Sequence, residues 1–228
     1  MFNYQSGTTV LNTNGNTVGE VVRVVMNPHT HKVSHLVIRK GFLFTEDKVL
    51  SIDMVDKTDN GKLVLAEDNL DVEALPPFKE EHFVPAGEID NEDAVDFSQK
   101  TIVPSLYLYP PVDGGMMVPM DYGLNLPQMV RYEEYNVPSN TIALKPNANV
   151  ITADGKHVGQ VEEIMVDDDS KLASHFVISR GMFFKHHKLI PTIWIDSIME
   201  NNVHLTMKAD FLKTLPEYKG EKVVTSQA

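Results

Sequence analysis

The sequence predicts a mainly β fold built from two small β-barrels that arose by internal duplication. Shifting the chain by 140 positions aligns residues 10–81 with residues 150–221 without a gap, and 18 of the 72 aligned positions are identical. Both segments consist of short β-branched runs separated by turn residues, which is typical of small barrels and sandwiches. We expect a Pro- and Tyr-rich connector between the copies and a short helix at the end of each copy.

The first hairpin of each copy is predicted from its turn. The turns are Thr-Asn-Gly at 13–15 and Ala-Asp-Gly at 153–155. Asn-Gly and Asp-Gly favour the positive φ angles of tight hairpin turns. Extended segments are therefore expected directly before each turn and over residues 18–26 and 158–166 after it.

The remaining elements follow in the same order in both copies. A polar turn is expected at 27–30 and at 167–170, because Asn, Asp, Pro and Ser favour turns. The predicted strands that follow are 34–39, 48–55 and 62–66 in the first copy, and 174–179, 188–195 and 202–207 in the second. The helical candidates Asn69–Leu75 and Ala209–Leu215 are each stopped by a proline.

The repeated pattern resembles a known family. Both copies contain V-x4-G-x2-V-G-x-V, then S-H-[LF]-V-I, and a terminal L-P. This pattern is similar to that of the PRC-barrel family, named from the cytoplasmic domain of the photosynthetic reaction centre H subunit and also found in a ribosome maturation factor. The resemblance implies two tandem six-stranded barrels, used mainly as interaction modules and without shared catalytic residues. The second copy is the closer match, since the first has Ser51 where the second has Pro191.

These observations divide the chain into four parts. We expect a first PRC-barrel copy at 1–81, a connector at 82–146, a second PRC-barrel copy at 147–221 and a flexible tail at 222–228. A module of this size buries limited apolar area, so packing of the copies on each other or on the connector should add stability.

Composition excludes several functions. The chain has no cysteine, and its formal net charge is −12. Nucleic acids and anionic lipid surfaces attract clustered Lys and Arg, so direct binding to either is not expected. The sequence contains no run of 18 apolar residues, so we expect no membrane insertion. Its first residues lack the features of a signal peptide, so a cytoplasmic location is expected.

No catalytic, cofactor or metal site is predicted. His35 and His175 occupy the same position in both copies and are interpreted as structural, because no further ligands accompany them in a zinc-binding pattern. The acidic run 167–169 lacks the spacing of an EF-hand and is interpreted as a turn. Phosphate-binding glycine loops and serine nucleophile elbows are absent. The protein is therefore not expected to be an enzyme.

The connector is the candidate docking segment. Residues 82–146 hold eight of the 13 prolines and five of the seven tyrosines. Tyrosine and methionine supply adaptable apolar contact area, and proline favours extended geometry. Such a segment packs on its own domains, docks on a partner or stays disordered. The predicted partner-binding residues are Tyr107, Tyr109, Met116, Met117, Tyr122 and Tyr132.

Three functional hypotheses follow. The first is a non-catalytic adaptor that binds another protein, at a membrane-associated or photosynthetic-type complex by analogy with the H subunit. The second is a ribosome or RNA-processing assembly factor that acts through a basic ribosomal protein. The third is a small-ligand or metal binder between the barrels, which rests on fold analogy alone. The duplication leaves open whether the chain also forms a homo-oligomer.

Overall fold

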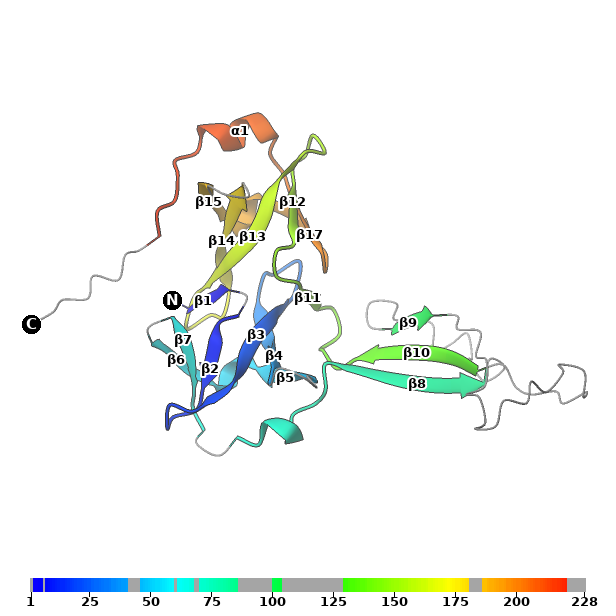
Figure 1. The fold of residues 1–228 in the computed structure, drawn as a ribbon. Helices are drawn as coiled ribbons and strands as arrows, with labels where there is room; N and C mark the ends of the chain where they lie inside the picture. Colours follow the sequence, from blue (N-terminus) through cyan, green and yellow to red (C-terminus); the bar gives the residue numbers. More distant parts are fainter. Residues whose placement is uncertain are drawn as a thin grey trace, which may run out of the picture. The chain divides into compact units, whose positions relative to one another are not determined.

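The computed structural model describes residues 2–5, 7–40, 46–59, 61–67, 70–85, 100–103, 129–180 and 186–220. The chain divides into two compact units, one formed by Met1–Phe78 with Asn140–Ala228 and the other by Lys79–Ser139. The first unit holds the two aligned segments of the sequence as two seven-stranded sheets (Figure 1). We call these segments the first half and the second half.

The sheet of the first half has the strand order β5-β4-β3-β2-β7-β6. Its strands are β2 (Thr9–Leu11), β3 (Thr17–Met26), β4 (Val33–Arg39), β5 (Asp47–Ser51), β6 (Val55–Asp59) and β7 (Lys62–Leu65). The 3-10 turn η1 (Ile52–Met54) joins β5 to β6, and a second 3-10 turn, η2 (Val72–Ala74), follows β7. All neighbouring strands are antiparallel except β2 and β7, which are parallel.

The sheet of the second half has the corresponding order β15-β14-β13-β12-β17-β16. Its strands are β12 (Asn149–Ile151), β13 (His157–Val166), β14 (Ala173–Arg180), β15 (His186–Pro191), β16 (Ile195–Ile198) and β17 (Asn202–Leu205). The 3-10 turn η4 (Thr192–Trp194) joins β15 to β16, and the helix α1 (Ala209–Thr214) follows β17.

Equivalent strands of the two sheets pair in the same register, with residue numbers that differ by 140. Val10 lies opposite Gly19 in the first half, and Val150 lies opposite Gly159 in the second. Both long strands carry bulges at equivalent positions, between Val21 and Arg23 and between Val161 and Glu163. The expected hairpin turns are confirmed by Gly15 and Gly155, which have φ angles of 79° and 73°.

The expected closed barrels are not found. The hydrogen-bonded path of each sheet ends at strands that do not pair with each other among the described residues, β5 with β6 and β15 with β16. Each of these pairs is joined by a single 3-10 turn. The turn connects the two edge strands in sequence, but among the described residues no ladder of hydrogen bonds joins them, so each sheet stays open. The mainly β character of the prediction is confirmed.

The two halves exchange one strand each. The N-terminal strand β1 (Phe2–Gln5) pairs with β13 of the second half, and β11 (Ile142–Leu144) pairs with β3 of the first (Figure 1). The exchange is reciprocal, since Phe2 lies opposite Val166 and Ile142 lies opposite Met26, again at the offset of 140. Each sheet therefore obtains its seventh strand from the sequence that precedes the other half.

The two halves also meet at the start of β4 and β14. The Val33 N–H donates to the Lys171 carbonyl, and the Ala173 N–H donates to the His31 carbonyl, both at 2.9 Å. His31 and Lys171 both adopt positive φ angles, 58° and 57°. Backbone hydrogen bonds thus join the two sheets across this seam.

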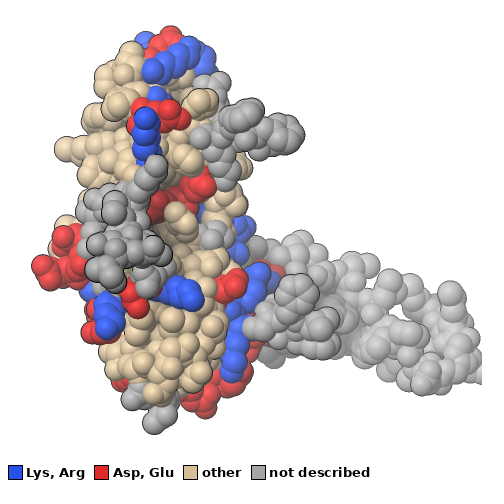
Figure 2. Space-filling model, turned by 60° about the vertical axis from the view of Figure 1, so that its left-hand side comes forward, with Lys and Arg blue, Asp and Glu red and all other residues tan. Residues whose placement is uncertain are grey.

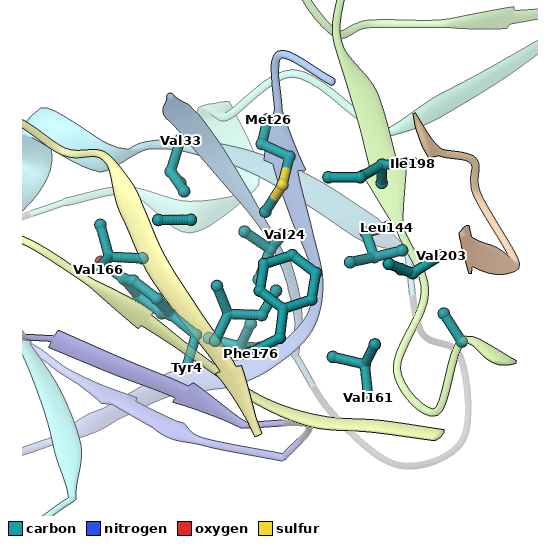
Figure 3. Packing of buried hydrophobic residues seen from close by; sticks show 14 of the residues in the cluster. Tyr4, Val24, Met26, Val33, Leu144, Val161, Val166, Phe176, Ile198 and Val203 are labelled. Carbon is teal, nitrogen blue, oxygen red and sulfur yellow. The ribbon is translucent and has the colours of Figure 1, made fainter. Parts of the chain in front are cut away.

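One hydrophobic core runs through both halves. Tyr4 of β1 is 2% exposed and lies among buried residues of both sheets, including Val24 and Phe176 (Figure 3). Burying an aromatic side chain stabilises a fold by several kcal/mol, about 3–5 kcal/mol when judged by truncation to Ala. The exchanged strands therefore contribute side chains to the core as well as hydrogen bonds to the sheets.

The predicted helices are confirmed in one half only. Helix α1 occupies most of the range predicted in the second half. Among the described residues 70–75 of the first-half candidate, the 3-10 turn η2 forms in place of a helix, capped by the Asp71 carboxylate, which accepts a hydrogen bond from the Glu73 N–H at 3.1 Å. The α conformation is disfavoured for a residue before proline. Leu75 and Pro76 both precede a proline, whereas in the second half only Leu215 does.

The second unit is described as a three-stranded antiparallel sheet. Its strands are β8 (Lys79–Pro85), β10 (Met129–Tyr135) and β9 (Lys100–Val103), with β10 in the centre. The Lys79 ammonium binds the Glu133 carboxylate at 2.7 Å and the Glu81 carboxylate at 3.1 Å. These contacts, led by the hydrogen bond to Glu133, raise the pKa of Lys79.

Candidate functional site

Charged side chains gather where the two halves meet. The Glu200 carboxylate binds the Arg23 guanidinium at 2.6 Å and the Lys145 ammonium at 3.0 Å. Partial burial raises the pKa of Glu200, but the hydrogen bonds from Lys145 and Arg23 outweigh it, so the pKa lies below its ordinary value. The Arg23 guanidinium also lies over the Phe78 ring, 4.9 Å from its centre. This cluster ties strand β3 to the turn between β16 and β17.

A small cleft lies beside this cluster. It is lined by residues of both halves, including Tyr4, Arg23, Leu144 and Lys145, and has a volume of about 30 Å³. A volume of that size holds about one water molecule, whereas metabolite sites measure hundreds of Å³. This cleft is therefore too small for an organic ligand.

The repeated histidines lie on equivalent strands. His35 lies opposite Ser51, and His175 lies opposite Pro191. Burial lowers the pKa of His35, and the Asp53 carboxylate partly opposes this effect. Among the described residues there is no group of three or more His, Cys, Asp and Glu side chains that could hold a metal ion.

The second half exposes an apolar surface that the sequence analysis missed. We define the apolar surface as Ile193, Trp194, Met207 and Phe211, from η4, the segment after β17 and α1. Trp194 and Met207 are half-buried and also pack against the core. Ile193 is 82% exposed and Phe211 is 46% exposed. The Trp194 and Phe211 rings meet edge to face at 5.6 Å. Trp194 is the only tryptophan of the chain.

The apolar surface is bordered by charges of both signs. Lys156 pairs with Asp154 at 2.8 Å, and Lys213 pairs with Asp210 at 2.7 Å. Asp154 also accepts a hydrogen bond from the N–H of Ala209 at the start of α1. Its contacts, led by the hydrogen bond from Lys156, hold the pKa of Asp154 far below its usual range. We define the rim as these two pairs together with Lys208, which precedes α1.

The corresponding place in the first half is acidic. We define the acidic surface as Asp53, Glu67, Asp71 and Glu73, all of which are exposed. At the offset of 140 these residues stand where the second half has Ile193, Met207, Phe211 and Lys213. The local backbone is alike at the first of these positions, because the Ala66 N–H donates to the Met54 carbonyl just as the Thr206 N–H donates to that of Trp194.

Comparing the two halves position by position could have revealed both surfaces from sequence. An alignment that scores identities draws attention to the shared core and turns, such as Gly15 and Gly155. The informative positions are those that differ most, Asp53 against Ile193 and Asp71 against Phe211. The fold is common to both halves, so these differences mark surfaces that the fold does not require.

Most of the predicted partner-binding residues lie outside the described part of the chain. These are Tyr107, Tyr109, Met116, Met117 and Tyr122. Tyr132 lies in the central strand β10, opposite His82 of β8 and Ile102 of β9. Its role in partner binding stays a prediction.

On the face shown in Figure 2, acidic and basic side chains lie beside one another, with broad uncharged areas between them. Within the part of the chain that the structure describes, no helix has the length and apolar character needed to cross a lipid bilayer.

Two protein families match parts of the chain. Residues 6–72 match the PRC-barrel domain, and residues 144–213 match a family described as an uncharacterized protein conserved in bacteria (DUF2171). No curated protein matches the chain. The resemblance to the PRC-barrel domain is thus confirmed for the first half. Two tandem PRC-barrel copies stay a prediction, since the second half matches a different family.

Proposed function

We propose that this chain is a non-catalytic adaptor that docks on another protein, at a membrane-associated or photosynthetic-type complex. The PRC-barrel match over residues 6–72 carries this proposal, because that domain points to a protein-interaction module. A cytoplasmic location is part of the same proposal.

The acidic surface supports a basic partner. Its four carboxylates lie on the first half, which also contains the PRC-barrel match. Opposite charges at the edge of an interface raise association rates and exclude wrong partners more than they add affinity. The connector tyrosines would then bury apolar area on the same partner, as proposed for Tyr107, Tyr109, Tyr122 and Tyr132.

The common strand order and register support an internal duplication as the origin of the two halves. A duplicated domain that keeps its core and changes its surfaces gains a second function without losing the first. The acidic and apolar surfaces, at equivalent positions of the two halves, are consistent with such a division of roles.

Affinity purification of the tagged protein from its own cells, followed by mass spectrometry, tests the adaptor proposal. We expect a stoichiometric protein partner. A variant with Tyr107, Tyr109, Tyr122 and Tyr132 changed to Ala should lose the partner if the connector is the docking segment. Retention of the partner would move the docking site to the halves, and the absence of any partner would contradict the adaptor.

The contribution of the acidic surface is tested by the triple variant Asp53→Asn, Glu67→Gln and Asp71→Asn. Asn at position 71 keeps an oxygen that can cap η2, so the fold should be preserved. We expect slower association with a basic partner than for the wild type. The control carries Glu20→Gln and Asp196→Asn, two exposed carboxylates outside the acidic surface. Salt-sensitive comigration with a ribosomal subunit would instead favour the ribosome-assembly hypothesis.

A further inference from the structure

The exposure of the apolar surface to solvent requires an explanation. Large apolar side chains that are exposed together and bordered by polar residues typically mark an interaction site. Ile193 is 82% exposed, although the first half carries Asp53 at the same place on the same type of 3-10 turn. The apolar residue is therefore not required by the fold, and its exposure needs another explanation.

The rim restricts the choice of occupant. It holds Lys156, Lys208 and Lys213 against Asp154 and Asp210, so its charges nearly cancel. A nearly neutral rim offers little steering toward a strongly acidic or a strongly basic partner. It also lacks the cluster of unpaired Lys and Arg that binding to anionic lipid requires. Two copies of such a rim do not repel each other, and their central residues are both apolar.

We propose that the apolar surface binds the apolar surface of a second copy of this chain, giving a two-fold symmetric dimer. The same contact cannot form between two acidic surfaces, because carboxylates would face carboxylates. Nor does an acidic surface suit an apolar one, because Asp53 and Asp71 would lose water against Ile193 and Phe211. Only one of the three pairings between copies is favourable, so assembly stops at the dimer and does not extend into a filament.

The dimer places two acidic surfaces on one particle. If each docks on a partner, the effective concentration of the second site raises avidity without any new contact. The inference goes beyond the adaptor proposal, since self-association is measured with the purified protein alone. A chain that stays monomeric would not contradict the adaptor proposal. A chain without a protein partner would not contradict the dimer.

Sedimentation velocity of the purified full chain over a wide concentration range tests the dimer. We expect a reversible monomer–dimer equilibrium, accompanied by a blue shift of Trp194 fluorescence as the dimer forms. The double variant Ile193→Asp and Phe211→Asp should weaken dimerisation by at least ~100-fold, because two apolar anchors are lost from each copy. Both substitutions should leave the fold intact. Asp53 already occupies the position of η1 that is equivalent to Ile193 in η4. A carboxylate at position 211 would lie in the first turn of α1, where negative charge is favourable.

Met199→Asp is the matched control. Met199 is 51% exposed, has Asp59 as its counterpart in the first half and lies outside the apolar surface. This variant adds the same kind of charge and should dimerise like the wild type. A wild-type chain that stays monomeric, or a dimer that the double variant leaves intact, would overturn the proposal. So would a Trp194 blue shift produced by vesicles of phosphatidylcholine and phosphatidylglycerol, which would assign the surface to a membrane.

Discussion

At the scale of single residues, the Glu200 side chain forms an ion pair between the two halves. This residue of the second half accepts from Arg23 of the first half and from Lys145, which follows β11, and its backbone carbonyl accepts from the Lys145 N–H at 2.8 Å. The equivalent position in the first half is Asn60, so the ion cluster has no counterpart at the offset of 140. The cluster is thus a local addition to a repeated fold.

We expect Glu200→Gln to lower the free energy of unfolding by about 0.5–1 kcal/mol at pH 7. The value is small because the Glu200 side chain is 45% exposed and solvent screens its ion pairs. Urea denaturation of the variant and the wild type measures the difference. Glu20→Gln, at an exposed position of β3, is the control and should change the free energy of unfolding by less.

The effect of Glu200→Gln on the free energy of unfolding should depend on pH. The pKa of Glu200 is lower in the folded chain than its ordinary value of 4.5. Its contribution to stability is therefore fully present above pH 4.5 and is lost as the pH falls through the folded pKa. The stability difference between Glu200→Gln and the wild type should shrink below pH 4.5. A difference that stays constant there would show that shape, and not charge, causes the effect.

At the scale of elements, sequence patterns predicted local structure well and pairing between distant segments poorly. The turns at Gly15 and Gly155 follow from positive φ, which is a property of two or three residues. The strand exchange could not be predicted in this way. Strands β1 and β11 have four and three residues, lie before the detected repeat and gain their stability only from the strand that they meet. The sequence of such a short strand does not indicate which strand it will pair with.

The apolar surface was missed for a related reason. A predicted strand or helix carries no information about which of its apolar residues face the core, unless the periodicity is regular. The 3-10 turn η4 and the six-residue helix α1 are too short to show a period. Within their own segments, Ile193 and Phe211 were thus not distinguishable from core residues. Only the comparison with their acidic counterparts Asp53 and Asp71 separates them from the core.

Strand β1 provides a test of the exchange. Tyr4 is buried in the common core, while its neighbour Asn3 is exposed on the same strand. We expect Tyr4→Ala to lower the free energy of unfolding by about 3–5 kcal/mol, as for other buried aromatic residues. Asn3→Ala should change it by no more than about 0.5 kcal/mol. Equal effects in urea denaturation would show that β1 does not pack into the core.

At the scale of the whole molecule, the exchanged strands and the common core make the two halves one cooperative body. Buried residues of both sheets belong to a single hydrophobic cluster. A half expressed alone would lack one strand of its sheet and would expose the core residues that the other half covers. The strand exchange therefore accounts for how two modules of limited size reach stability.

This arrangement predicts a single thermal transition for the two halves. Calorimetry on the full chain should give one transition for the body formed by residues 1–78 and 140–228, with a ratio of calorimetric to van't Hoff enthalpy of about 1 once any separate signal from residues 79–139 is subtracted. Tyr4→Ala should lower the melting temperature of both halves together, although the substituted residue belongs to the N-terminal strand alone. Two transitions, of which only one shifts in this variant, would show that the halves unfold independently and that the exchanged strands are not what couples them.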